Sequence, residues 1–209
     1  MNTEQKVARA LLSIGAVGFV PDNPITFKSG IVSPVYIDNR KLPFHPKEWK
    51  VIIEGFAKII KKEKIKAEVI AGVEAAGIPH SAALGFFTKT SSVFVRKEAK
   101  DHGTKKMIEG GSVLNRHVLL VEDLVTTGGS SLGAVHHVRK GGGKISHCLV
   151  IVSYNFPSSK EAFHNAKMKL HAITSFPVIL DEAKKLGIIQ GKTLAKIEDW
   201  FQEHTGHTK

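Results

Sequence analysis

The most informative stretch of the chain is 118–131, where an apolar run is followed by acids, hydroxyls and glycines. Residues 118–121 predict a buried strand, with Glu122 and Asp123 at its carboxyl end. A loop of threonines, glycines and serines then leads into a helical pattern. The amides of such a loop, with the positive end of the helix dipole, favour a phosphate. The acids would repel that phosphate and suit ribose hydroxyls, or a cation reached through water, so the stretch predicts a ribose-phosphate site.

A simple helix cap and the two common nucleotide loops fit this stretch less well. An acid before a turn can cap a helix, but capping requires neither two acids nor a Thr-Thr-Gly-Gly run. The chain has no Gly-x-x-x-x-Gly-Lys-Ser/Thr, and no Gly-x-Gly-x-x-Gly follows a strand, which excludes both nucleotide loops. The order of acids, threonines and glycines resembles the phosphoribosyl-diphosphate loop of type I phosphoribosyltransferases. That resemblance implies that Glu122 and Asp123 are catalytic. It also implies that the substrate is held by Glu122, Asp123, Leu124, Val125, Thr126, Thr127, Gly128, Gly129 and Ser130.

A long polar segment, 97–111, follows a second predicted strand and begins beside a group of cations. In isolation an exposed charged turn would be the better explanation, because surface runs of charge are common. Next to a phosphate loop, four cations would stabilise the charge that builds on a departing diphosphate. The segment resembles the catalytic loop of orotate phosphoribosyltransferases, which reaches into the neighbouring subunit and therefore implies a homodimer. By this resemblance Lys100 is the principal catalytic lysine, His102 assists it, and Arg96 and Lys97 bind substrate.

The segment 27–38 reads, on its residues alone, as an extended stretch with a turn at Ser29-Gly30, and an ordinary hairpin would explain it. Its Lys-Ser-Gly-x-x-Ser-Pro-x-Tyr pattern resembles the orotate-binding hood of the same family. The resemblance implies that Lys28 reaches the orotate and that Tyr36 packs on its ring. Residues 71–79 are similar to the family's diphosphate loop, although Ala76 stands where many members have a lysine. Residues 152–157 contain no arginine, where many members place one against the base.

The remaining pattern predicts the elements that position these residues. Strands are expected at 69–73, 92–95, 118–121 and 147–153, and helices at 6–14, 46–64, 77–87, 129–140 and 194–201. Repeated strand–helix order predicts an α/β fold with a parallel sheet. The resemblance implies a type I phosphoribosyltransferase core with helices on both faces and a small N-terminal hood. We expect one domain over 1–209, with the hood in 1–45, the core sheet in 65–155 and a C-terminal segment in 156–209.

Composition narrows the setting of the protein. The net charge of +11 suits either nucleic acid or small polyanionic substrates, but the chain has 7% aromatic residues and no recognisable nucleic-acid module. The single cysteine, Cys148, lies in an apolar run and is expected to be a buried strand residue, which fits a reducing compartment. No signal peptide and no apolar run long enough to span a membrane are visible. A cytoplasmic location is therefore expected.

The sequence as a whole predicts an enzyme that transfers a phosphoribosyl group to orotate, giving orotidine 5′-phosphate and diphosphate in de novo pyrimidine synthesis. Mg²⁺ is the expected cofactor, held mainly by substrate and water, with no protein residue assigned as a metal ligand. Two alternatives remain open at this point. The acceptor could be another base, such as a purine or uracil, or the protein could be a regulator that binds both phosphoribosyl diphosphate and nucleic acid.

Overall fold

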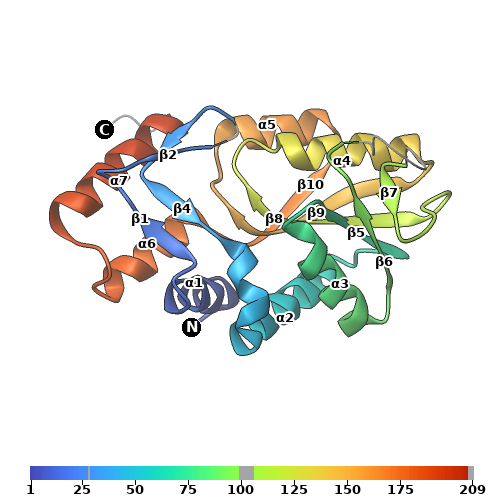
Figure 1. The fold of residues 1–209 in the computed structure, drawn as a ribbon, viewed down its shortest axis with the longest axis horizontal. Coiled ribbons are helices and arrows are strands. Elements are labelled where there is room, and N and C mark those ends of the chain that lie inside the picture. The colour runs from blue at the N-terminus through green and yellow to red at the C-terminus, as the bar shows by residue number, and fades with distance from the viewer. Residues whose placement is uncertain (28, 99–105, 207–209) are drawn as a thin grey trace.

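The computed structural model describes residues 1–27, 29–98 and 106–206, and a six-stranded sheet forms its centre (Figure 1). Neighbouring strands run parallel except at one edge, where β7 pairs antiparallel with β6. The predicted α/β fold with a mostly parallel sheet is confirmed. In spatial order the strands are β10 (Lys169–Ser175), β9 (Lys144–Ser153), β8 (His117–Val125), β5 (Val69–Val73), β6 (Ser91–Val95) and β7 (Ile108–Glu109).

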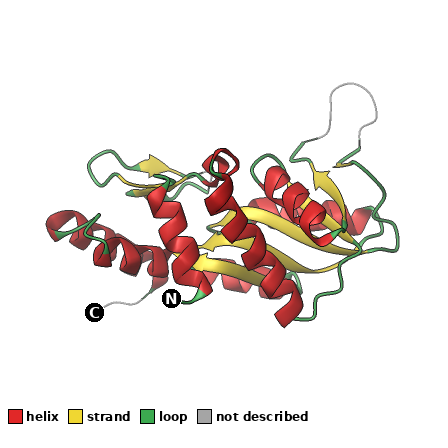
Figure 2. Ribbon diagram, turned by 90° about the horizontal axis from the view of Figure 1, so that it is seen from below, coloured by secondary structure: helices red, strands yellow, loops and turns green. Residues whose placement is uncertain are grey.

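Helices cover both faces of this sheet (Figures 1 and 2). Side chains alternate along β9, so that Leu149 and Ile151 join one apolar cluster while Cys148 and Val150 join the other. Burial on both faces explains why these strands are continuous apolar runs in the sequence. Within the described residues, no helix is long and apolar enough to cross a membrane. The first cluster includes α1 (Thr3–Ser13), α2 (Pro46–Lys62), α3 (Gly77–Thr88) and α6 (Phe176–Lys185), and the second α4 (Gly129–Lys140) and α5 (Pro157–Asn165).

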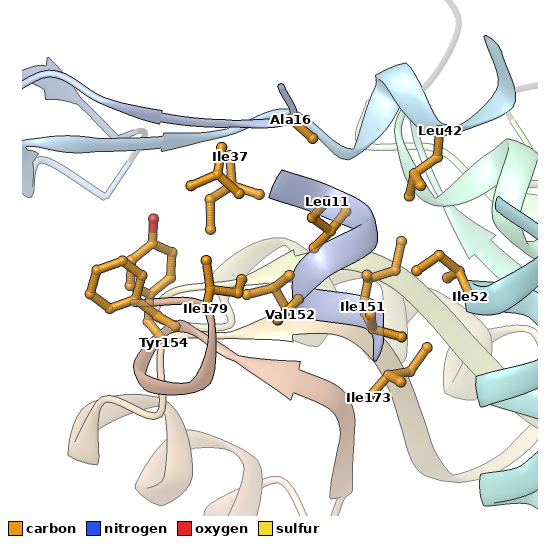
Figure 3. Close-up of a cluster of buried hydrophobic side chains, with 14 of the residues drawn as sticks. Leu11, Ala16, Ile37, Leu42, Ile52, Ile151, Val152, Tyr154, Ile173 and Ile179 are labelled. Carbon is orange, nitrogen blue, oxygen red and sulfur yellow. The ribbon is translucent and has the colours of Figure 1, made fainter. Parts of the chain in front are cut away.

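The first cluster is the larger part of the core. Leu11 of α1, Ile52 of α2 and Ile179 of α6 converge there on Ile151 and Ile173 of the sheet (Figure 3). Four of these five side chains are completely buried, and Ile173 is 2% exposed. Burial of each such side chain contributes about 1.5–3 kcal/mol relative to exposure. This packing fixes the sheet whose edge, at the carboxyl ends of the strands, carries the candidate site.

Two small antiparallel pairs of strands, the second within the connection of the first, form a hood that is separate from the main sheet. One pairs β1 (Val17–Phe19) with β4 (Val35–Ile37), and the other pairs β2 (Ile25–Thr26) with β3 (Val32–Ser33). The C-terminal helix α7 (Gly191–Thr205) holds the hood, because the Trp200 indole N–H donates to the Val32 carbonyl at 2.7 Å. Its Lys196 ammonium also lies 2.8 Å from an Asp22 carboxylate oxygen. The two ends of the chain therefore stabilise one structure. The short 3₁₀ helix η1 (Asn39–Phe44) leads from the hood to α2.

The structure differs from the predicted elements in two places that matter for the site. Strand β8 runs to Val125 rather than ending at residue 121, since Glu122 and Val125 continue the ladder with Val150 and Ser153 of β9. The acid pair thus lies within a strand and not after it. The sheet also extends beyond the predicted range of 65–155, because β10 pairs with β9. The sequence of β10, in which Lys169 and His171 alternate with apolar residues, hid this strand.

The order of the strands creates a switch point between β5 and β8. The chain leaves β5 through α3 toward β6 on one side, and it leaves β8 through α4 toward β9 on the other. Helices α3 and α4 pack on opposite faces of the sheet. In open α/β sheets a ligand crevice forms at such a point, beyond the carboxyl ends of the strands. The predicted phosphate loop begins there.

Candidate active site

The loop from β8 to α4 depends on Gly128, the residue before the first turn of the helix. Its φ is +89°, in the left-handed region, which costs other residues about 1–2 kcal/mol. A Cβ on Gly128 would also lie 2.7 Å from a ring carbon of Phe163 in α5. Both the conformation and the available space therefore require glycine. This glycine lets the chain turn directly from the end of β8 into α4.

The N-terminus of α4 offers backbone N–H groups to an anion. The N–H of Leu132 donates to the Gly128 carbonyl at 2.9 Å. The amides that precede Leu132 at the start of the helix have no acceptor inside it. No side chain of the described residues caps this end, whereas Asn2 and Gln5 form a capping box at the start of α1. Uncapped amides and the positive end of the helix dipole together favour a phosphate here.

A cleft of about 400 Å³ opens over this loop and is the centre of the candidate site. It joins the ends of β5, β6 and β8 to the first turns of α4, and Ser29 extends from the hood into its rim. Cations and hydroxyls therefore surround the same space. Of the residues predicted to bind substrate, those that line the cleft are Arg96, Lys97, Leu124, Thr126, Thr127, Gly128, Gly129 and Ser130.

Val125 plays a different part from its neighbours in the loop. Its side chain is 1% exposed and belongs to the second apolar cluster. Its carbonyl accepts a hydrogen bond from the Tyr154 N–H at 3.0 Å. Val125 therefore anchors the loop to the core, and its side chain is not available to a ligand.

Both acids of the pair are shielded from solvent, unlike the usual ligands of a hydrated cation. Glu122 is 5% exposed, and Asp123 is partly buried. Burial raises the pKa of Glu122 well above its ordinary value, and the neighbouring charge of Asp123 raises it further, while Lys97 acts in the opposite direction. The Asp123 N–H also donates to a Glu122 carboxylate oxygen at 3.1 Å. Glu122 is therefore biased toward its neutral form, which can both donate and accept hydrogen bonds with hydroxyls.

The face of β8 toward α3 supports Asp123. The buried Asn39 side-chain amide donates to the Asp123 carbonyl at 3.0 Å. His80 of α3 is completely buried, and its Nδ1 accepts the Trp49 indole N–H at 2.9 Å. Burial lowers the pKa of His80 to about 4, although the charge of Asp123 opposes the shift. Asn39 thus fixes the main chain at Asp123, and the low pKa of His80 means that this neighbour brings no positive charge to the aspartate.

Arg96 reaches the cleft from the opposite side and is fixed by carboxylates. Its Nη1 lies 3.9 Å from Glu74 and 3.6 Å from Glu109. Its Nε donates to the Glu98 carbonyl at 3.1 Å. Glu74 also accepts the Lys97 N–H at 3.1 Å, so the loop after β5 is tied to the end of β6. The cationic side of the cleft is thus preorganised on two strand ends.

The sequence of the chain is similar to those of known proteins. A sequence model described as the phosphoribosyl transferase domain matches residues 42–181. The chain is 35% identical to the orotate phosphoribosyltransferase of Coxiella burnetii, over 97% of this chain and 97% of that protein. It is 38% identical to the orotate phosphoribosyltransferase of Lactiplantibacillus plantarum, over 97% of this chain and 96% of the relative. The chain belongs to the orotate phosphoribosyltransferase family.

The fold of this family member is also similar to that of a solved structure, Leishmania donovani UMP synthase. The TM-score is 0.85 at 25% sequence identity, and the match covers 97% of this chain. It covers 43% of the other chain, so this family member spans less than half the length of that protein. The similarity therefore concerns one part of the larger protein.

The segment after β9 contains no arginine. Its Tyr154 is completely buried. Its ring lies edge-on to Phe27 of the hood, with centroids 5.5 Å apart, and stacks on Phe176 at 5.1 Å. Trp200 of α7 joins the same cluster. This segment therefore packs the hood onto the core and offers no charge to a base.

Some residues predicted for this family site lie outside the described part of the chain or away from the cleft. Lys28, Lys100 and His102 are outside the described residues. Tyr36 lies in β4, and its hydroxyl accepts a hydrogen bond from an Arg40 side-chain nitrogen at 3.1 Å. Ser29 is the described hood residue that lines the cleft. The base-binding half of the prediction thus stays a prediction.

Sequence reasoning missed several residues around the family site. His80 and Asn39 were not identified, because a histidine in an apolar helix and an asparagine after an extended segment have no distinctive spacing. His137 of α4, which lines the cleft, was also missed. One signal could have indicated His80 and Glu74. Both follow β5 at the same sheet edge as the acid pair, within one loop and one helical turn.

Proposed function

We propose that this chain transfers the 5-phosphoribosyl group from phosphoribosyl diphosphate to orotate, giving orotidine 5′-phosphate and diphosphate in de novo pyrimidine synthesis. One observation carries this proposal. The uncapped start of α4 directly follows the end of β8, which carries the acid pair, and both stand at the same sheet edge. A phosphate and sugar hydroxyls can be held there side by side. Membership of the orotate phosphoribosyltransferase family then selects the acceptor and the reaction.

The proposed chemistry divides between the two sides of the cleft. The amides of Gly129 and Ser130, with the threonine hydroxyls, grip the 5′-phosphate. Glu122 and Asp123 hold the ribose hydroxyls and favour the positive charge that develops on the sugar as its anomeric C–O bond breaks. Arg96 faces the departing diphosphate from the other side. Because orotate already carries a nucleophilic ring nitrogen, no strong general base is required, and positioning supplies much of the rate.

Mg²⁺ fits this site as a cofactor held chiefly by the substrate. The hydroxyl residues Thr126, Thr127 and Ser130 line the cleft, and the partly buried Asp123 directly precedes Leu124, which also lines it. Mg²⁺ prefers oxygen ligands, keeps several waters and binds through substrate phosphates, which matches such a donor set. When bound, it would neutralise charge on the diphosphate. Removal of Mg²⁺ by a chelator should abolish transfer, and added Mg²⁺ should restore it.

The proposal assigns Lys100 and His102 to the departing diphosphate, by resemblance to the family's catalytic loop. Lys100→Ala should lower kcat far more than it raises either KM, because the lysine acts on charge that develops during the reaction. Steady-state kinetics with each substrate varied in turn would measure both effects. Unchanged kcat would refute the role of the lysine.

A homodimer with this loop shared across the interface is part of the proposal. What supports self-association is an exposed apolar pair at the end of α3, where Phe86 is 90% exposed and Phe87 51% exposed. Mixing two inactive variants, Lys100→Ala and Asp123→Asn, tests the sharing. Mixed dimers would contain one site with neither change, so mixing should restore about a quarter of wild-type activity. No recovery after subunit exchange would indicate a loop that serves its own subunit.

The activity itself is tested by following the loss of orotate absorbance with phosphoribosyl diphosphate and Mg²⁺. Uracil, adenine and hypoxanthine serve as alternative acceptors in the same assay. Transfer to orotate alone supports the proposal, and a preference for another base overturns it. Binding of RNA or DNA without turnover would instead favour a regulatory protein, for which the net charge of +11 is suited.

We also propose a cytoplasmic location, because the chain has one cysteine and that cysteine is buried.

A further inference from the structure

His80 carries a buried hydrogen-bond donor in a fixed orientation, at the sheet edge where the acid pair lies. The residue lies in the first turn of α3 and has no exposed surface. Its Nδ1 accepts the Trp49 indole N–H at 2.9 Å. Because an indole nitrogen can only donate, Nδ1 must be unprotonated and Nε2 must carry the hydrogen. Among the residues that the structure describes, no atom accepts a hydrogen bond from Nε2.

The packing of α3 directs His80 toward β8. A Cβ on Gly77 would lie 2.6 Å from the Val121 carbonyl oxygen and 3.4 Å from the Glu122 Cα. His80 follows Gly77 by three residues, so the two lie on the same side of the helix. The charge of Asp123 is close enough to oppose the effect of burial on the His80 pKa. An unpaired donor therefore lies within the field of a carboxylate of the proposed ribose site.

Asn39 holds the same aspartate from its main chain. Its Nδ2 donates to the Asp123 carbonyl at 3.0 Å, and this bond fixes the orientation of the amide because a carbonyl only accepts. The Asn39 Oδ1 is buried and has no partner within the described ranges. Buried polar atoms in native proteins are almost always paired, and exceptions gather where function requires them. The unpaired His80 Nε2 and Asn39 Oδ1 therefore point to a functional role for the surroundings of Asp123.

We propose that His80 is a positioning residue for the ribose site, whose Nε2–H donates to the Asp123 carboxylate while that carboxylate binds a sugar hydroxyl. Trp49 fixes the tautomer, and Asn39 fixes the main chain of the aspartate. The hydrogen bond orients the Asp123 carboxylate beside Glu122. The inference rests on the proposed function, since it assigns the acid pair to the sugar hydroxyls.

The choice of a neutral donor has a chemical reason. Positive charge develops on the ribose as the diphosphate leaves, so a lysine or arginine against Asp123 would oppose the reaction. A histidine that stays neutral supplies a hydrogen bond without a full charge. Burial keeps His80 in that state, because a charged ring would lose its solvation. His80 thus orients the carboxylate and leaves its negative charge available to the sugar.

Sugar binding tests the inference without any base. We would titrate ribose 5-phosphate and its 2-deoxy and 3-deoxy analogues into wild type, His80→Leu and His80→Gln by calorimetry. Glutamine keeps both an acceptor for Trp49 and a donor for Asp123. Wild type and His80→Gln should prefer the ribose over at least one deoxy analogue. In His80→Leu that preference should fall by roughly 10–100-fold, the loss expected for a hydrogen bond to a charged group.

A structural role would give a different result. If His80→Leu weakens all three sugars equally, or leaves the preference unchanged, the positioning role is wrong. If His80→Leu does not fold, Trp49→Phe replaces it in the comparison. Loss of the indole N–H lets His80 adopt either tautomer, so Trp49→Phe should reduce the preference for ribose over the deoxy analogue. His80→Gln should retain that preference. Failure of transfer to orotate would count against the proposed function alone, since these titrations contain no acceptor. An unchanged sugar preference would count against His80 alone.

Discussion

Acidification should destabilise the folded protein through His80, and its burial sets the size of the effect. Burial disfavours the charged ring and lowers the pKa of His80 from 6.5 to about 4, although the charge of Asp123 opposes this shift. Between these pH values the unfolded chain binds a proton that the folded chain does not. The contribution of His80 to stability is therefore fully present above pH 6.5 and is lost as the pH falls to about 4.

The magnitude follows from the size of the pKa shift. Each pKa unit corresponds to about 1.36 kcal/mol, so the full loss is about 3 kcal/mol, with about 2 kcal/mol already lost at pH ~5. Burial also lowers the pKa of His137, His147 and His171, which adds loss of the same sign. The pKa of Glu122 is raised, mainly by burial, so protonation of Glu122 stabilises the folded protein as the pH falls. A matched variant is needed to separate His80 from these groups.

His80→Gln supplies that comparison, because glutamine can accept the Trp49 hydrogen bond and cannot be protonated in this range. Denaturant unfolding of both proteins at several pH values gives the free energy of unfolding for each. The difference between wild type and variant should shift by about 2 kcal/mol, to the disadvantage of wild type, from pH ~7 to ~5. Parallel curves for the two proteins would mean that His80 is not a buried neutral histidine in the folded state.

Three further predictions concern packing around the site. Gly77→Ala should lower stability by about 1–3 kcal/mol in denaturant unfolding, because its Cβ would meet the Val121 carbonyl at 2.6 Å; an unchanged midpoint would show that α3 can shift. Gly128→Ala should raise the KM for phosphoribosyl diphosphate more than it lowers kcat, since it distorts the loop and meets Phe163; an effect on kcat alone would contradict this. Burial raises the pKa of the Cys148 thiol, so it should resist a thiol reagent in the native protein and react after unfolding. Rapid native labelling would contradict that burial.

The sequence was sufficient for elements whose signals are local. Helix α4 begins at Gly129 and ends at Lys140, as predicted, because glycines stand at both ends of one amphipathic segment. Helix α1 covers most of the predicted 6–14 but begins at Thr3, because Asn2 and Gln5 form a capping box there. Strand β5 matches the predicted 69–73, since burial on both faces leaves a continuous apolar run. In each case neighbouring residues carry the whole signal.

Elements defined by distant partners could not be predicted in the same way. Strand β8 continues through Glu122 and Asp123 only because β9 provides a pairing partner as far as Ser153. The short strand β7 exists through its pairing with β6, and its two residues carry no pattern of their own. The support of Asp123 by Asn39 joins residues 84 positions apart. Such contacts arise from the fold and leave no spacing in the sequence.

Asp123 and the phosphate loop are close in sequence, yet they are supported from opposite faces of the sheet. On the face of α3, Gly77 packs against the backbone of β8, and the charge of Asp123 acts on the pKa of His80. On the face of α4, the start of the helix offers amides, and Phe163 closes the space beside Gly128. This division follows from the switch point between β5 and β8, which sends the two crossover helices to different faces. A change near His80 should therefore alter the recognition of sugar hydroxyls and leave phosphate binding nearly intact, while changes at Gly128 should do the reverse.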